Sequence, residues 1–193
     1  MTLPPSLRWT GDHLELLDQR RLPEAVVFMQ LNKWEEVAQA ITTMAVRGAP
    51  AIGIAAAWGV VLAAQAGDDL QVAIRVLRDS RPTAVNLGWA LNRMQAAVTA
   101  SSSVDSVMLA MVAAELQNDD CLQTQRLVDY GVSLLEHGCR VLHHCHTGAI
   151  ATAGVGTALG VIAAAHGRGI LRHAWLDETR PRLQGAALSA WEL

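Results

Sequence analysis

One stretch, from Ile41 to Gly67, constrains the fold more than any other part of this chain, because Arg47 is its only charged residue. Its later part predicts a helix over 50–65 that is apolar on almost every side. Such a helix has to be buried, either in a protein core or in a membrane. This one is rich in alanine and glycine and opens with Pro50, unlike the dense Leu, Ile, Val and Phe of a bilayer span. We therefore expect a helix at the centre of a soluble bundle.

Arg47 lies in the turn before this helix and is followed by Gly48, Ala49 and Pro50. Gly48 and Ala49 leave the backbone N–H groups open to a ligand, and proline suits the first turn of a helix. A helix N-terminus beside a guanidinium is an anion site, most often for phosphate. The alternative is a core turn whose arginine pairs with a structural carboxylate, and the segment alone favours neither.

The composition excludes several classes of protein. The chain has 193 residues, 51% of them hydrophobic and 17% charged, with a formal net charge of −3 and no basic block, which argues against a nucleic-acid interface. Cys121, Cys139 and Cys145 make an odd count without disulfide spacing, so we expect free thiols in a reducing compartment. The first residues lack the pattern of a signal peptide. We expect a cytoplasmic protein without a membrane segment.

The pattern along the chain predicts a small β-rich start followed by helices. Short strands are expected at 7–9, 13–17 and 25–31, and a helix capped by Asn32 carries Val37, Ile41 and Met44 on one face. A helix follows from Asp68 or Asp69 to about Asp79. Further helices are expected after 81–83, with Leu87, Ala90, Leu91 and Met94 inward, and over 104–137 with a possible interruption at 119–120. Residues 101–103 read as a loop.

After Gly138 the pattern becomes that of an α/β domain. A strand over 141–144, a helix over about 157–166 and a strand over 170–176 form the unit of a parallel sheet, and 183–193 begins another helix. Two parallel strands do not make a stable sheet. We therefore expect the chain to stop inside this domain.

The densest set of reactive side chains is His143-His144-Cys145-His146, at the end of the first strand of that unit. Ligands bind at the carboxyl ends of such strands, and a thiol near imidazoles can act as a base or nucleophile. The alternatives are an inert buried cysteine and, less favoured, a zinc site, in which only a pair such as His144 and His146 shares one ion.

Three other segments can take part in binding. The glycines at 154, 156 and 160, with Asp177 beyond, resemble a dinucleotide fingerprint, but they do not follow their strand at once, so close packing of the helix on the sheet is the better interpretation. Arg180, Arg182 and Gln184 lie after the second strand and can bind phosphate or sugar hydroxyls, unless the arginines pair with Asp177 or Glu178. Arg81 lies at a helix start.

These segments, taken in order, resemble the methylthioribose-1-phosphate isomerase family. The resemblance rests on residues 44–53 (MAVRGAPAIG), 80–87 (SRPTAVNL), 144–149 (HCHTGA), 177–185 (DETRPRLQG) and 190–193 (AWEL). The wider family also contains other sugar-phosphate isomerases and regulatory subunits of a eukaryotic initiation-factor exchange complex. The arginine turn together with the His-Cys motif favours the isomerases.

The resemblance implies an α/β fold. Residues 1–137 would form a mostly helical domain with short strands in 6–31, and 138–193 the beginning of a Rossmann-like parallel domain. It implies a homodimer in the full-length form and conversion of 5-methylthioribose 1-phosphate to 5-methylthioribulose 1-phosphate in methionine salvage, without a cofactor or metal. Carried over by motif, Cys145 is the catalytic cysteine; the substrate-binding residues are Arg47, Gly48, Ala49, Arg81 and Gln184.

Two departures from the family pattern matter. The family usually has asparagine where this chain has His146, and its catalytic aspartate and a substrate-binding Lys-Asn pair have no counterpart in this sequence. We therefore expect the chain by itself to be inactive or nearly so. The alternatives are a non-catalytic relative that senses sugar phosphates and an isomerase of another ribose or deoxyribose phosphate.

Overall fold

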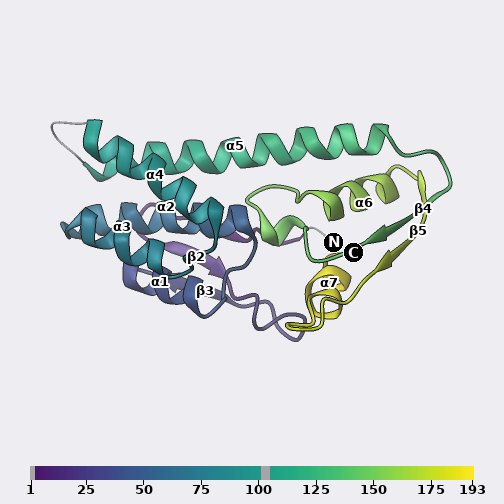
Figure 1. Ribbon diagram of the computed structural model, residues 1–193, viewed down its shortest axis with the longest axis horizontal. Coiled ribbons are helices and arrows are strands. Elements are labelled where there is room, and N and C mark those ends of the chain that lie inside the picture. The colour runs from purple at the N-terminus through teal and green to yellow at the C-terminus, as the bar shows by residue number, and fades with distance from the viewer. Residues whose placement is uncertain (1–2, 101–104) are drawn as a thin grey trace.

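The first three strands form a small antiparallel sheet in the order β1-β2-β3 (Figure 1). The structure is a computed structural model that describes residues 3–100 and 105–193. β1 (Leu7–Trp9), β2 (Leu14–Leu17) and β3 (Phe28–Leu31) confirm the predicted strands, although the third begins three residues later than expected. Leu16 pairs with both Leu7 and Met29 across the sheet and is fully buried, so this sheet turns an apolar face to the helices.

Helix α2 lies at the centre of a bundle, as the sequence predicts. It is long and apolar enough to cross a membrane by length and composition, yet 72% of it is buried inside the protein. The helices around it bury the faces that the 3.6-residue period indicates, including Leu87, Leu91 and Met94. The bundle comprises α1 (Trp34–Thr42), α2 (Ala49–Ala66), α3 (Leu70–Asp79), α4 (Val85–Ala100) and α5 (Ser106–Ser133). The loop predicted at 101–103 lies outside the described residues.

Two details of the predicted helices are wrong. Asn32 does not cap α1: the helix begins at Trp34, and the Glu36 carboxylate accepts the N–H groups of Asn32 (2.7 Å) and Lys33 (3.1 Å) instead. The expected interruption at 119–120 is also absent, because α5 is continuous from Ser106 to Ser133. There the Asp120 carboxylate accepts the N–H of Ala153 (2.7 Å), so a residue with low helix propensity is held by a tertiary contact.

The predicted parallel unit is present. β4 (Cys139–His143) pairs with β5 (Leu171–Leu176), with Val141 opposite Ala174, and α6 (Ala158–Gly167) connects them. The 3₁₀ turn η1 (Ala149–Ala151) follows β4. The helix expected over 183–193 divides into a wider π-helical turn, η2 (Gly185–Ser189), and α7 (Ala190–Glu192). Figure 1 shows α5 running along the helical bundle and on over α6.

A second apolar cluster joins the N-terminal sheet to the segment after β4. Leu17 of β2, Ile150 of η1 and Leu188 of η2 are fully buried, and Leu22 completes the group. These residues are far apart in the sequence. Their packing holds the N-terminal sheet close to the loop that follows β4 and to η2.

Candidate functional site

Gly48 lies where the turn before α2 meets η1. It is the N-cap residue of α2, with φ of 97° and ψ of 129°, a backbone conformation that is essentially restricted to glycine. A Cβ at this position would overlap the backbone of Ala151, whose carbonyl carbon would lie 2.6 Å away. Gly48 is therefore required both for the conformation of the turn and for its contact with η1.

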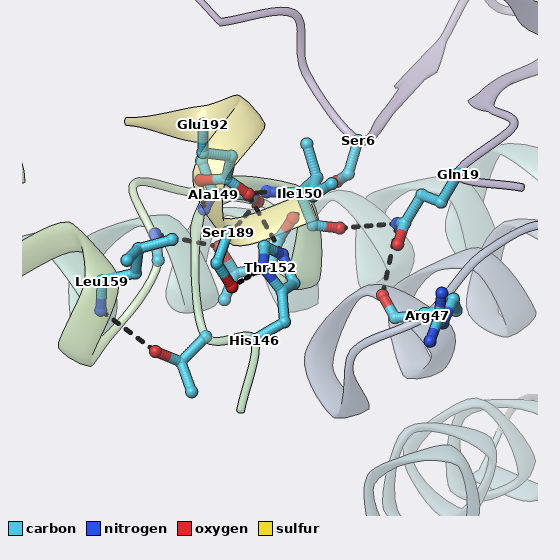
Figure 2. A network of polar contacts seen from close by, with 12 residues as sticks. Ser6, Gln19, Arg47, His146, Ala149, Ile150, Thr152, Leu159, Ser189 and Glu192 are labelled. Atoms are coloured by element: carbon cyan, nitrogen blue, oxygen red, sulfur yellow. Dashed lines mark hydrogen bonds and ion pairs between the residues drawn. The ribbon is translucent and has the colours of Figure 1, made fainter. Parts of the chain in front are cut away.

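Gln19 bridges the same two segments. Its side chain is buried, and Nε2 donates to the carbonyl oxygens of Arg47 (3.3 Å) and Ile150 (2.8 Å), as Figure 2 shows. Ser6 adds a second link, since its hydroxyl donates to the carbonyl oxygen of Thr152 at 2.5 Å. A lone glutamine after a strand belongs to no motif, so sequence analysis gave no signal for it.

Two arginines from other segments act electrostatically on Arg47. Burial is the largest cause that lowers the pKa of the half-buried Arg47 guanidinium, and the charges of Arg182 and Arg81 lower it further. The thiol of Cys145 acts on the same pKa in the opposite direction. The charge of Arg47 is thus influenced by groups in the turn before α4, the loop after β4 and the loop after β5.

This arginine cluster, Arg47, Arg81 and Arg182, is not neutralised by carboxylates. Within residues 3–100 and 105–193, none of the three guanidiniums forms an ion pair with an aspartate or glutamate. The interpretation of Arg47 as one half of a structural ion pair is therefore not supported. Three cations that repel one another stabilise a bound anion.

The loop after β5 is shaped by Glu178. Its carboxylate accepts the backbone N–H groups of Thr179 and Gly185 (both 2.8 Å) and of Ala186 (3.0 Å), and these bonds lower its pKa. Glu178 is thus engaged with the backbone and does not neutralise Arg182. In the same loop, the backbone turns at Arg180 and Leu183, which have positive φ values of 70° and 48°.

Gln184, a predicted substrate ligand, lies at the end of this loop, directly before η2. The hydroxyl of Thr179 donates to its Oε1 at 2.7 Å, which fixes the side-chain carbonyl. Among residues 3–100 and 105–193, no group accepts a hydrogen bond from Nε2 of Gln184, so its amide donors are available for a ligand.

Cys145 follows β4 in a strained backbone conformation. Its φ is 69°, in the left-handed region that costs a residue with a side chain roughly 1–3 kcal/mol and persists only where surrounding contacts enforce it. The residue is half-buried, and its carbonyl oxygen accepts the hydroxyl of Ser189 at 3.3 Å. Strain of this kind is common at functional sites, and its place at the carboxyl end of a parallel strand is the expected one.

The three histidines around Cys145 point to different surroundings. His143 is buried, with its Nε2 2.9 Å from the hydroxyl oxygen of Thr147, and burial is the main cause that lowers its pKa. His144 is exposed near Asp177 (3.5 Å), whereas His146 is buried with Ser189. His144 and His146 therefore do not share an ion. Among the described residues, no group of three or more His, Cys, Asp or Glu is arranged to hold a metal.

Gly154 and Gly160 have a packing role, but their partner is α5 rather than the sheet, whereas Gly156 lies against Gly148 and Ala149. A Cβ on Gly154 would lie 3.0 Å from Cα of Cys121, and one on Gly160 would lie 2.9 Å from Cγ2 of Val128. Both neighbours are on α5. Gly154 and Gly160 thus admit the close approach of this long helix.

Comparison with known proteins gives consistent matches. A family model described as "Initiation factor 2 subunit family" matches residues 45–193. The whole chain is 79% identical to a methylthioribose-1-phosphate isomerase of Synechococcus sp. (strain CC9605), of which it covers 57%. It therefore spans little more than half the length of that relative.

Two solved structures share the fold. The crystal structure of 5-methylthioribose 1-phosphate isomerase from Pyrococcus horikoshii OT3 matches with a TM-score of 0.92 and 38% identity, over 100% of this chain and 57% of that one. The translation initiation factor eIF-2B subunit delta from A. fulgidus matches with a TM-score of 0.84 and 37% identity, over 99% and 59%.

Proposed function

The chain belongs to the Initiation factor 2 subunit family, and from that premise we propose that it carries the phosphate-binding turns and the reactive thiol of a methylthioribose-1-phosphate isomerase. The reaction converts 5-methylthioribose 1-phosphate to 5-methylthioribulose 1-phosphate, a step of methionine salvage. The name of the Synechococcus relative, 79% identical over the whole chain, supports this choice within the family.

The observation that carries the proposal is the unneutralised arginine cluster. Arg47, Arg81 and Arg182 come from three segments. Burial and then the charges of Arg182 and Arg81 lower the pKa of Arg47, and a phosphate dianion would oppose that effect. Hydrogen bonds to charged groups contribute about 1.5–3 kcal/mol each, so three guanidiniums supply a substantial part of the binding energy for a small sugar phosphate. Gly48 and Ala49 open α2, whose first N–H groups and dipole favour the same anion.

The remaining roles follow from the chemistry of an aldose–ketose conversion. The 1-phosphate holds the sugar ring closed, so an acid must assist ring opening and a group must manage the transfer of hydrogen from C2 to C1. Cys145 is the group we assign to the reacting carbons, because it follows a parallel strand at its carboxyl end, where ligands of such folds bind, and has a strained backbone. Gln184 has amide donors suited to a sugar hydroxyl. None of these roles requires a cofactor or a metal.

Binding tests this proposal directly. We expect calorimetric titration of the purified chain to detect 5-methylthioribose 1-phosphate and not 5-methylthioribose, and Arg47→Gln to weaken binding at least tenfold, about 1.4 kcal/mol. Arg93→Gln is the matched control, since Arg93 is an exposed arginine near Glu115 on the bundle. Equal binding of the phosphorylated and unphosphorylated sugars would refute the phosphate role.

Turnover requires a second experiment. A chimera that adds the part of the Synechococcus relative not matched by this chain is expected to isomerise the substrate, and Cys145→Ser in that chimera to abolish turnover while leaving binding in place. Full turnover by the Cys145→Ser chimera would refute the catalytic role of the thiol.

A second candidate is a non-catalytic relative that senses a sugar phosphate, favoured by the 0.84 TM-score with the A. fulgidus initiation factor subunit. It predicts binding in the same titration without turnover by the chimera. Another ribose or deoxyribose phosphate isomerase is distinguished by which sugar phosphate binds most tightly.

We propose the wider organisation by the same reasoning. Residues 1–137 and 138–193 form two domains, the second of Rossmann-like type, and the full-length protein is a cytoplasmic homodimer. Limited proteolysis near Gly138 and light scattering of the chimera test the domain boundary and the assembly.

A further inference from the structure

Three buried side chains form a cluster beside Cys145: Glu192, His146 and Ser189 (Figure 2). Nδ1 of His146 lies 3.1 Å from the hydroxyl oxygen of Ser189, and Nε2 lies 3.1 Å from Oε1 of Glu192, without the alignment of a hydrogen bond. The side chains of His146 and Glu192 are each only 3% exposed. Charged and polar groups so deeply buried are costly unless their partners fix them.

The cluster contacts the peptide of Cys145 and the loop that follows it. The Ser189 hydroxyl donates to the carbonyl oxygen of Cys145 itself at 3.3 Å. The Glu192 carboxylate accepts the N–H groups of Ala149 (2.7 Å) and Ile150 (3.1 Å), at the start of η1. Both ends of the loop that follows the thiol are thus tied to 189–192.

Gly148 makes room for this arrangement. A Cβ there would overlap the Glu192 carboxylate, which reaches the backbone only because the position is a glycine. His146 directly follows Cys145 in the sequence, yet its two ring nitrogens face Ser189 and Glu192. It is therefore turned away from any role as the base of the thiol.

We propose that Glu192, His146 and Ser189 are positioning residues that hold Cys145 in its left-handed conformation and so set the direction of its thiol. The inference rests on the proposed function for its purpose, because a thiol at the reacting carbons has to be aimed. Its structural content is independent of that function. The strain at Cys145 has to be enforced by neighbours, and these are the side chains that contact its peptide and the next turn.

The rate at which each cysteine reacts with iodoacetamide tests the proposal, with the products quantified by peptide mass spectrometry. The three cysteines of the chain are free, so Cys121 and Cys139 serve as internal references. In Ser189→Ala we expect Cys145 to react at least threefold faster, because its half-buried thiol gains access once the peptide is released. Cys121 and Cys139 should stay within twofold, and Ser189→Thr, which keeps a hydroxyl, should restore the original rate at Cys145.

An unchanged rate at Cys145 in Ser189→Ala would overturn the proposal. So would a parallel rise at all three cysteines, which would indicate general loosening rather than positioning. If Ser189→Ala loses its circular dichroism spectrum, Glu192→Gln, which keeps the shape and one carbonyl acceptor, is read by the same two outcomes. The assay uses no sugar phosphate, so a failure of the proposed function in the titration leaves its result intact.

Discussion

Replacing Gly48 by alanine tests the contact between the turn before α2 and η1. The backbone there, at φ of 97° and ψ of 129°, costs a residue with a Cβ roughly 1–3 kcal/mol. The new methyl group would also overlap the backbone of Ala151, which cannot move away as a flexible side chain would. Overpacking of this kind costs about 1–3 kcal/mol in addition. We therefore expect a loss of about 2–6 kcal/mol in the free energy of unfolding.

For a chain of this length that loss lowers Tm by about 5–20 °C, measurable by differential scanning calorimetry. Gly67→Ala is the matched control. Gly67 ends α2 with a positive φ of 74°, and nothing lies within 4 Å of the site of its Cβ. Its replacement carries only the backbone cost, about 1–2 kcal/mol. The steric part of the reasoning is refuted if Gly48→Ala costs no more than Gly67→Ala.

Three further predictions concern the bundle. Leu91→Ala should cost about 2–5 kcal/mol in urea unfolding because Leu91 is fully buried, whereas Val85→Ala, at a position 81% exposed, should cost little; equal losses would contradict the packing. Asp69→Ala, which removes the cap of α3, should cost about 0.5–2 kcal/mol, and no change would show that the cap is dispensable. Asp120→Asn should gain stability relative to wild type as pH rises from about 4 to 7. Burial raises the pKa of Asp120 in the folded protein above its ordinary value of 3.8, so the wild type loses stability as pH rises through that folded pKa, and the neutral Asp120→Asn variant does not. A stability difference between variant and wild type that stays constant with pH would refute this.

Much of the fold could be predicted because it is written in local periodicity. The buried faces of α2 and α4 and the parallel β4–α6–β5 unit follow from apolar spacing and turn residues alone. One error occurred where a distant contact overrides propensity, and the other where a nearby carboxylate binds the N–H groups at the helix start. Asp120 stays helical because its carboxylate accepts the N–H of Ala153. α1 starts one residue later than expected, with Lys33 in place of Asn32 as its N-cap, and the Glu36 carboxylate accepts the N–H groups of Asn32 and Lys33.

The candidate site divides in the same way. Arg47 and Cys145 were predicted through motifs that resemble a family, and their roles at a shared site stay a prediction. Gln19 and Ser189 have no motif at their positions, and Glu192 lies in the 190–193 segment, which was quoted for the resemblance without a role for its carboxylate. They matter only because the chain folds back over more than forty residues, as in the 43-residue separation between Ser189 and His146. Sequence patterns do not encode such contacts.

The unbroken α5 fixes the rotational relation between the two parts of the protein that pack against it, at α2 and at α6. An α-helix turns by about 100° per residue, so adding a single residue near its midpoint would rotate everything beyond it by that angle. The apolar seam against α2 at one end and α6 at the other would then no longer face the same side. The number of residues from Ser106 to Ser133 therefore fixes the angle between the two packed faces of α5. We expect an insertion or deletion within this helix to be tolerated far less than a substitution of one of its outward-facing residues.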